Sequence, residues 1–230
     1  TSIPPLHATV AAVYQWFESL PDDVREQLLA RARRRTLAAG QRLYSRGDVA
    51  DGVYAVVIGS IRVSGVSQEG RQTILDLYGP GHWFGEASAL SLLPRTHDAA
   101  AHDAAVLLHL RQADLEALLL GHPGVSRAFM RLGGLRQTVL LQAIEQYSAY
   151  SIEIRLASRL LMLSAVYGTP CEEGTLIDIV IAQDELAQMV GCARQRVNQL
   201  ISRMTAQGLL FMRKGVVIRD EAGLAGMVTA

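Results

Sequence analysis

Side chains that can recognise DNA bases gather on one stretch near the C-terminus, between residues 193 and 203. The stretch contains the following candidates: Arg194, Gln195, Arg196, Asn198, Gln199 and Arg203. An arginine can donate two hydrogen bonds to a guanine edge, and a glutamine or asparagine can pair in the same way with adenine. A helix that presents these groups together would be suited to reading base pairs in the major groove of DNA.

The apolar residues around this stretch predict two helices that would position it. In the first helix, Leu186 and Val190 are four residues apart with Met189 between them, so one face is apolar. The second helix has apolar residues at i, i+3, i+4 and i+7: Val197, Leu200, Ile201 and Met204. Gly191 lies between the two and permits the left-handed backbone of a sharp turn. The pattern predicts a helix-turn-helix, and the alternative is a helical hairpin with a solvated polar face.

The residues after the second helix favour DNA binding over the plain hairpin. Residues 208–218 read as a strand, a turn at Lys214 and Gly215, and a second strand, which makes a winged helix-turn-helix. We add Gln183, at the start of the first helix, and Lys214, in the turn, to the expected DNA contacts. Lys214 is the only lysine of the chain, so phosphate and base contacts would fall to arginine.

Bulk properties allow two domains and exclude several classes of protein. The 230 residues are half apolar, and 22 basic residues balance 22 acidic ones, which argues against a generally basic DNA-coating protein. Two cysteines do not make a disulfide framework or a four-cysteine metal site. No apolar run is long enough to span a membrane and no signal peptide opens the chain, so we expect a cytoplasmic protein.

The sequence pattern of the N-terminal half changes near residue 40, from helical to glycine-rich. Residues 1–36 look helical, and we interpret the basic run at Arg31, Arg33, Arg34 and Arg35 as a solvated helix end. Nine of the 20 glycines then fall within residues 40–85, between short alternating apolar runs. This spacing predicts antiparallel strands in a sandwich or roll, with a further strand at 104–110.

A short segment between these strands, Phe84 to Thr96, could hold an anion. Gly85 and Glu86 could begin a short helix through Leu92, whose first backbone N–H groups would be free. Arg95 could supply a bidentate guanidinium for a phosphate, and Glu86 could accept from sugar hydroxyls.

The combined pattern resembles the superfamily of the cyclic-AMP receptor protein and the fumarate–nitrate reductase regulator, which are bacterial transcription factors. The resemblance covers about residues 15–220. It rests on the glycine-spaced roll, then FGE…PRT at 84–96, then ELAQMVGCAR at 185–194, in the family's order and spacing. It implies an α+β fold with a cyclic-nucleotide-binding β-roll and flanking helices (1–122), a long dimerisation helix (123–150) and a C-terminal winged helix-turn-helix (151–230).

The resemblance also implies an effector site. Arg95 and Thr96 would meet a cyclic phosphate, Glu86 the ribose 2′-hydroxyl, and Gly85 and Ala87 would allow close backbone approach. Members that respond to cyclic AMP place hydroxyl residues of the long helix against adenine, where this chain has Leu140 and Leu141. The neighbours Thr138 and Gln142 could substitute in another register. We therefore expect a cyclic nucleotide, cyclic AMP or cyclic GMP, as effector, and no metal.

The long helix from 123 to 150 predicts a homodimer. Its apolar residues follow a 3/4 repeat: Val125, Phe129, Leu132, Leu135, Val139, Ala143 and Ile144. A helix of this length, about 40 Å, exceeds one small domain, so we interpret the stripe as a two-helix interface between subunits, with packing on its own roll as the alternative. Partners implied are double-stranded DNA with an inverted repeat, a second subunit and RNA polymerase, and no membrane.

Two departures within the DNA reader change what it would bind. The family commonly has an acidic residue and a later arginine where this chain has Gln195 and Gln199, so we predict a different half-site. Ala182 stands where the first helix usually has a threonine N-cap, a loss of about 1 kcal/mol unless Gln183 or Asp184 compensates.

Rival interpretations keep part of this scheme. In one, the regulator has a haem-binding, gas-sensing or ligand-independent roll; His109 is expected to be a core residue of a strand. In the other, the chain is a nucleotide-binding signalling module whose helix-turn-helix contacts proteins. No catalytic arrangement stands out, so an enzyme is not expected.

Overall fold

The computed structural model describes residues 4–66, 72–213 and 215–229. They form two compact units, one of Ala12–Gln137 and the other of Thr1–Ala11 with Thr138–Ala230. No helix among the described residues is both long and apolar enough to cross a membrane.

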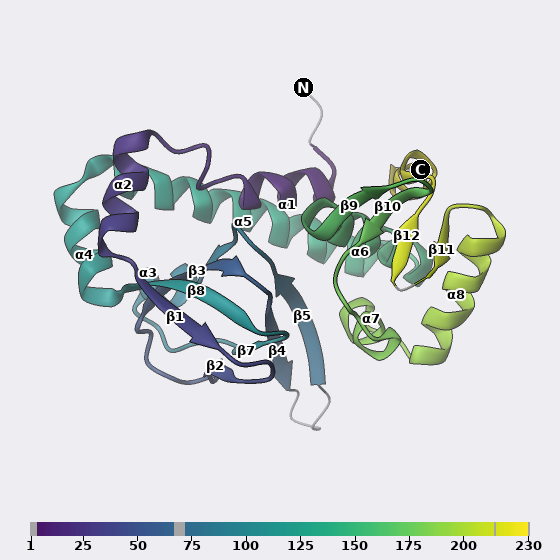
Figure 1. The fold of residues 1–230 in the computed structure, drawn as a ribbon, viewed down its shortest axis with the longest axis horizontal. Coiled ribbons are helices and arrows are strands. Elements are labelled where there is room, and N and C mark those ends of the chain that lie inside the picture. The colour runs from purple at the N-terminus through teal and green to yellow at the C-terminus, as the bar shows by residue number, and fades with distance from the viewer. Residues whose placement is uncertain (1–3, 67–71, 214, 230) are drawn as a thin grey trace. The chain divides into compact units, whose positions relative to one another are not determined.

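Ala12–Gln137 is built around a β-roll of two antiparallel four-stranded sheets (Figure 1). One sheet has the order β1-β8-β3-β6 and the other β2-β7-β4-β5. The strands are β1 (Arg33–Leu37), β2 (Arg42–Tyr44), β3 (Gly52–Ile58), β4 (Ile61–Val66), β5 (Gln72–Tyr78), β6 (Trp83–Phe84), β7 (Asp98–Ala101) and β8 (Ala105–Arg111). The roll expected from the glycine spacing is confirmed.

The core of the roll lies between the two sheets. Strand β3, GVYAVVI, is rich in β-branched and aromatic residues, which favour strands, and it buries Val53, Tyr54 and Val56. Side chains from the second sheet, Ile61 and Val63 among them, pack into the same cluster. This core fixes the start of β3 and the end of β6, where the candidate site lies.

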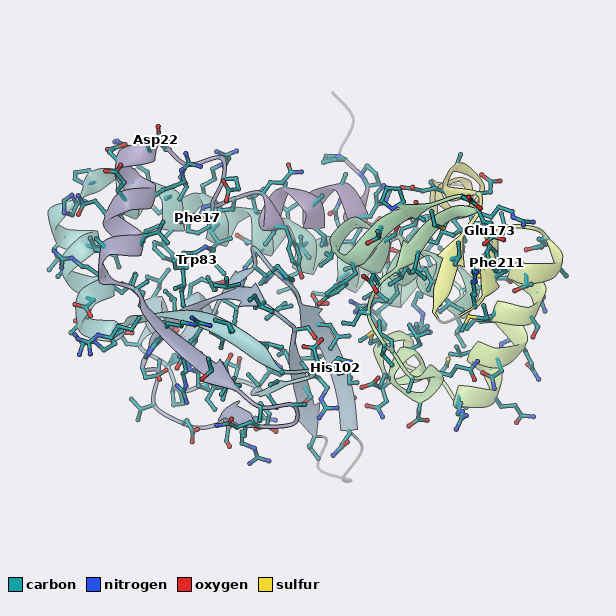
Figure 2. The ribbon with its side chains drawn as sticks, viewed as in Figure 1. Phe17, Asp22, Trp83, His102, Glu173 and Phe211 are labelled. Carbon is teal, nitrogen blue, oxygen red and sulfur yellow. The ribbon has the colours of Figure 1, made fainter. Side chains whose placement is uncertain are left out.

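Helices cover the outside of the roll. They are the C-terminal part of α1 (Leu6–Tyr14), α2 (Asp22–Arg31), α3 (Glu86–Ser91), α4 (Gln112–Gly121) and the first part of α5 (Pro123–Ala149). Trp16 is 1% exposed and donates from Nε1 to the carbonyl of Ala128 at 2.8 Å. Figure 2 shows Phe17 beside Trp83, whose rings stack with centroids 5.2 Å apart.

The expectation for residues 1–36 is wrong at its end. Helix α2 stops at Arg31, and the basic run continues into β1, an edge strand paired with β8. A strand sends successive side chains to opposite faces, so Arg33 and Arg35 share one face while Arg34 takes the other. The N-cap of α2 is Pro21, and Asp22 and Asp23 lie in the first turn of the helix.

The other unit carries the helix-turn-helix. It contains α6 (Ile152–Tyr167), α7 (Gln183–Val190), α8 (Arg194–Ala206) and α9 (Glu221–Thr229). An antiparallel sheet of order β11-β12-β10-β9 completes it, from β9 (Gly168–Cys171), β10 (Gly174–Ile177), β11 (Leu210–Met212) and β12 (Val216–Ile218). In Figure 2, Glu173 marks the β9–β10 turn and Phe211 marks β11. The turn residues Gly168, Pro170 and Gly174 would favour a loop before the helix-turn-helix, but β9 and β10 pair as an antiparallel hairpin there.

Candidate effector site and DNA interface

Arg95 is held inside the roll by backbone carbonyls. It is 2% exposed; Nη1 donates to the Gly85 carbonyl at 2.9 Å and Nη2 to the Gly52 carbonyl at 2.7 Å. Both glycines have positive φ, and a Cβ on Gly85 would lie 2.7 Å from Nη1 of Arg95. The glycines therefore permit the close approach that buries the guanidinium.

Glu86 also lies in this site. It is the first residue of α3 and is 4% exposed. Its Oε1 pairs with Nη1 of Arg136 at 2.6 Å, and Arg136 comes from α5. Nη2 of the same arginine contacts Nε2 of His82 at 2.8 Å and donates to the Trp83 carbonyl. Glu86 and Arg136 are therefore charged partners inside the roll, and removing either one would leave the other buried without its counter-charge.

Arg95 has an acidic partner of its own, Asp51. Nη2 of Arg95 lies 2.6 Å from Oδ1 of Asp51, and the hydroxyl of Tyr54 donates to Oδ2. Burial raises the pKa of Asp51, but the hydrogen bonds from Tyr54 and Arg95 outweigh it, so the pKa lies below its usual value. Asp51 is therefore ionised at neutral pH.

Aromatic rings line both ion pairs. The guanidinium of Arg95 sits 4.4 Å from the ring centroid of Tyr44, a cation–π distance. Burial raises the pKa of Tyr44 to about 12, and Arg95, Glu86, Arg136 and Asp51 all act on it electrostatically. The two pairs thus share one low-dielectric neighbourhood around this ring.

Four buried polar atoms in this neighbourhood have no hydrogen-bond partner among the described residues. They are Nε of Arg95, Oε2 of Glu86, Nε of Arg136 and Nδ1 of His82. Buried polar groups are nearly always paired, so a cluster of unpaired ones marks a place where a polar ligand or water fits. The arrangement can bind an anion next to a hydrogen-bond acceptor.

The sequence-predicted effector residues fall into two groups. Gly85, Glu86 and Arg95 come together as described, with Ala87 exposed in the first turn of α3. Thr96 is exposed, and its Oγ1 contacts Nδ1 of His97 at 2.9 Å. The roles of all of them stay predictions.

The second group lies in the other compact unit. Thr138, Leu141 and Gln142 line a hollow of about 530 Å³ together with Pro4 and Pro5. Nε2 of Gln142 donates to the Pro4 carbonyl at 2.7 Å. Sequence reasoning missed Asp51, which is 44 positions from Arg95, and Arg136, which is 50 positions from Glu86, because no local motif spans such separations.

His109, which was expected to be a buried core residue of a strand, is more exposed than predicted. His109 does lie in β8, but it is only partly buried and stacks on Tyr54 with ring centroids 4.4 Å apart. Nε2 contacts the Asp51 carbonyl at 3.1 Å, and burial lowers the pKa of His109.

The turn of the helix-turn-helix has the expected geometry. Gly191 has φ of 73°, the left-handed conformation that ends α7 and starts the reversal. The apolar faces of both helices are buried, Val197 and Leu200 fully so. The hydroxyl of Tyr147 donates to the Met189 carbonyl, and Arg155 lies 5.0 Å from the Tyr147 ring.

Most candidate DNA residues lie on the outer face of α8. Arg194, Gln195, Arg196 and Gln199 are exposed there. Asn198 is only partly exposed, and its Oδ1 is buried without a partner among the described residues. Because this amide oxygen is buried away from solvent, Asn198 is less well placed to contact a base than the exposed residues of α8.

The remaining DNA candidates are more peripheral. Arg203 lies at the end of α8 and pairs with Glu153 of α6 at 3.1 Å. Gln183 is the first residue of α7 and is partly exposed. Lys214 lies outside the described residues. At the same turn, Arg213 pairs with Glu173 at 3.5 Å, so the turn carries a second cation that sequence reasoning overlooked.

Comparison with known families supports the two-part organisation. A family model described as a cyclic nucleotide-binding domain matches residues 34–122, and a model described as a Crp-like helix-turn-helix domain matches residues 154–227. The chain belongs to the superfamily of the cyclic-AMP receptor protein and the fumarate–nitrate reductase regulator. Its named relatives are transcription regulators, and the chain is a regulator of the same type.

Several members of the superfamily resemble the chain over most of their length. The cyclic AMP receptor protein of Thermus thermophilus is 27% identical over 208 residues, 90% of this chain and 93% of that protein. A CRP-like cAMP-activated global transcriptional regulator of Mycobacterium tuberculosis is 25% identical over 189 residues, 81% and 84% of the two chains. The fold matches FixK2 of Bradyrhizobium japonicum, with a TM-score of 0.74 at 20% identity over 86% of this chain and 98% of that one.

Proposed function

We propose that the protein is a cytoplasmic homodimeric regulator that binds an inverted-repeat operator and responds to a cyclic nucleotide held by the roll. The observation that carries the effector assignment is the buried cluster at the start of α3. There Arg95, a cation, and Glu86, an acceptor, lie close together and each keeps an unpartnered polar atom. This pair has the chemistry of a phosphate beside a ribose hydroxyl.

The relatives support a cyclic nucleotide. Two of them are named as a cyclic AMP receptor protein and as a cAMP-activated regulator. In our proposal Arg95 and Thr96 bind the cyclic phosphate, Glu86 binds the ribose, and Gly85 and Ala87 allow close approach. Thr138, Leu141 and Gln142 of α5 stay the sequence-based candidates for contact with the base.

Calorimetric titration of nucleotide-free protein with cyclic AMP, and with cyclic GMP for comparison, tests this assignment. Binding in the micromolar range that disappears in Arg95→Gln supports it. If neither nucleotide releases heat, the cyclic-nucleotide effector is withdrawn. A Soret band in the purified protein would instead favour the haem-binding roll.

The dimer proposal rests on the second half of α5. Leu140 and Leu141 are each 60% exposed and Ile144 is 52% exposed, along one stretch of helix. Exposed leucines at this density on a helix indicate an apolar interface with another chain. In a two-fold dimer, paired α8 helices about 34 Å apart would contact successive major grooves of an inverted repeat.

The DNA proposal assigns base contacts to Arg194, Gln195, Arg196 and Gln199, with Gln183, Asn198, Arg203 and Lys214 at its border. Selection from random oligonucleotides should yield an inverted repeat. Its half-site should accept adenine at the positions that Gln195 and Gln199 contact. On that site, Arg194→Ala should cost about 1–3 kcal/mol and relax one base position. Arg127→Ala, which removes an exposed arginine of α5, serves as control. Equal affinities for the Arg194 variant and the parent would refute the assignment of α8.

DNA-bound dimers are proposed to act through RNA polymerase, as transcription regulators do. Transcription in vitro from a promoter that carries the selected operator tests this. Polymerase occupancy that does not change with the protein at saturation would contradict it.

A further inference from the structure

Asp51 occupies part of the anion-binding edge of Arg95. Nη1 of Arg95 donates one hydrogen bond, to the Gly85 carbonyl. Nη2 donates two, one to the Gly52 carbonyl and one to Oδ1 of Asp51 at 2.6 Å. A phosphate bound by two parallel N–H groups needs adjacent donors of the same guanidinium. While Asp51 stays in place, Nη2 has no donor left for such a ligand, and the positive charge of Arg95 is already neutralised.

The Asp51 carboxylate is placed so that it can leave. Its side chain is 46% exposed, whereas that of Arg95 is 1% exposed. It precedes β3, directly after Val49, which is 86% exposed, and Ala50. Water can therefore solvate the carboxylate after displacement, while the guanidinium keeps its two carbonyl partners and its position.

Other groups can hold the displaced carboxylate near the roll. The hydroxyl of Tyr54 donates to Asp51, and Arg35 donates to that same hydroxyl at 3.2 Å. Nε2 of His109 lies 3.7 Å from Oδ2. Asp51 thus has partners other than Arg95, which lowers the cost of giving up the arginine.

We propose that Asp51 is an internal counter-ion that competes with the phosphate of the effector for Arg95 and so raises the effector concentration at which the roll fills. The proposal rests on the effector assignment above and adds a residue that sets the response threshold. A ligand that binds only when Asp51 has left the arginine has an apparent dissociation constant raised by the rarity of that state.

The test replaces Asp51 by asparagine, which keeps the shape and one acceptor oxygen but removes the charge. Asp114→Asn is the matched control, because Asp114 pairs with Arg111 at 2.9 Å outside the site. We expect Asp51→Asn to bind cyclic AMP about tenfold more tightly than the parent, and Asp114→Asn to match the parent. Arg95→Gln in the Asp51→Asn background should abolish the gain. Binding by Asp51→Asn that is equal to or weaker than that of the parent overturns the proposal and leaves the effector assignment intact.

A second measurement keeps the proposal testable if no cyclic nucleotide binds. Thermal unfolding is recorded for parent, Asp51→Asn and Asp51→Ser in rising inorganic phosphate, with sodium chloride at matched ionic strength. A phosphate-dependent rise in Tm that is larger in the variants than in the parent, and that Arg95→Gln removes, supports the counter-ion without any cyclic nucleotide. No difference between variants and parent refutes it. A cooperative transition in each variant confirms that it folds.

Discussion

Two arginines of the roll each neutralise an acid that is distant in sequence. Arg95 meets Asp51, and Arg136 meets Glu86, whose side chain is 5% exposed. An ion in a low-dielectric interior depends on its partner, so such pairs are sensitive to the loss of one member and tolerant of the loss of both. The effects on stability of substituting the two members of a pair are therefore not additive.

Arg136→Met tests this coupling. The variant keeps an apolar stem of similar length but leaves the Glu86 carboxylate buried without its counter-ion. We expect a loss of about 3 kcal/mol in the free energy of unfolding, measured by urea denaturation. Glu86→Gln combined with Arg136→Met should recover most of it. A single variant as stable as the double one would show that the pair contributes nothing.

His82 makes stability depend on pH. Burial, and secondly Arg136, lower its pKa well below the usual 6.5. The unfolded chain then binds a proton that the folded protein does not, so this contribution is complete above about pH 6.5 and is lost as the pH falls through the folded pKa, at up to about 1.4 kcal/mol per pH unit. His97 and His109 also have lowered pKa values and act in the same direction.

The variant His82→Gln should flatten part of this slope. Unfolding free energies between pH 7 and 5 provide the measurement. An unchanged slope in the variant would mean that His82 is not the group that takes up the proton.

The sequence predicts the residues of this site that lie close together in the chain, and it misses those that are distant in sequence. Gly85, Glu86 and Arg95 lie within one stretch of eleven residues whose residue types already suggest a phosphate site. Asp51 and Arg136 become partners only after β3 and α5 have packed, and nothing in their own neighbourhoods distinguishes them from surface charges.

At the scale of elements, the first helix of the DNA reader begins without a capping side chain. Ala182 has none to offer, and the expected substitutes Gln183 and Asp184 are not the ones that compensate. Oε2 of Glu185 accepts from the backbone N–H of Ala182 at 2.9 Å, which is half of a capping box. The contact fixes the start of α7 and with it the turn that leads to α8.

Glu185→Ala should therefore destabilise the protein more than Asp184→Ala. Both remove one negative charge from the first turn, so both lose the same favourable interaction with the helix dipole. Only the first loses the hydrogen bond to the backbone N–H of Ala182, whereas Asp184 accepts a long, exposed one of 3.4 Å from the side chain of Gln188. We therefore expect an additional cost of about 1 kcal/mol for Glu185→Ala in thermal or urea unfolding. If the two variants lose the same free energy of unfolding, the loss comes from the removed charge and not from the hydrogen bond.

Element boundaries were predictable where apolar spacing is regular. Helices α7 and α8 follow their apolar faces closely. Strand β1 was mistaken for a helix end because its four consecutive polar residues, Arg33 to Thr36, show no alternation, and its identity comes from pairing with β8. Strand β9 reads as a loop because Gly168 and Pro170 are turn residues, yet it pairs with β10 across its length.

At the scale of the whole molecule, helix α5 serves two purposes along its length. Val125, Phe129 and Leu132 are at most 2% exposed and belong to the core beside the roll. Leu140, Leu141 and Ile144 are more than half exposed. The sequence shows one continuous stripe, because buried and exposed leucines look alike until the roll is in place.

This division predicts that dimerisation can be changed without unfolding the roll. Leu140→Glu should shift the protein to monomer in sedimentation velocity at micromolar concentration, since a charge would enter an apolar interface. Ala149→Glu introduces the same charge at an exposed position half a turn away from Leu140 around the helix, and it should leave the dimer intact. If both variants sediment like the parent, the interface lies elsewhere.

The four-stranded sheet of the DNA-binding unit ends in β9, whose four residues are all exposed. An open strand edge can pair with the edge of a neighbouring molecule wherever the protein is concentrated. The strand is short, and Pro170 within it has no N–H to donate. This edge is therefore a poor template for aggregation, and molecules crowded along one DNA can lie side by side without their sheets merging.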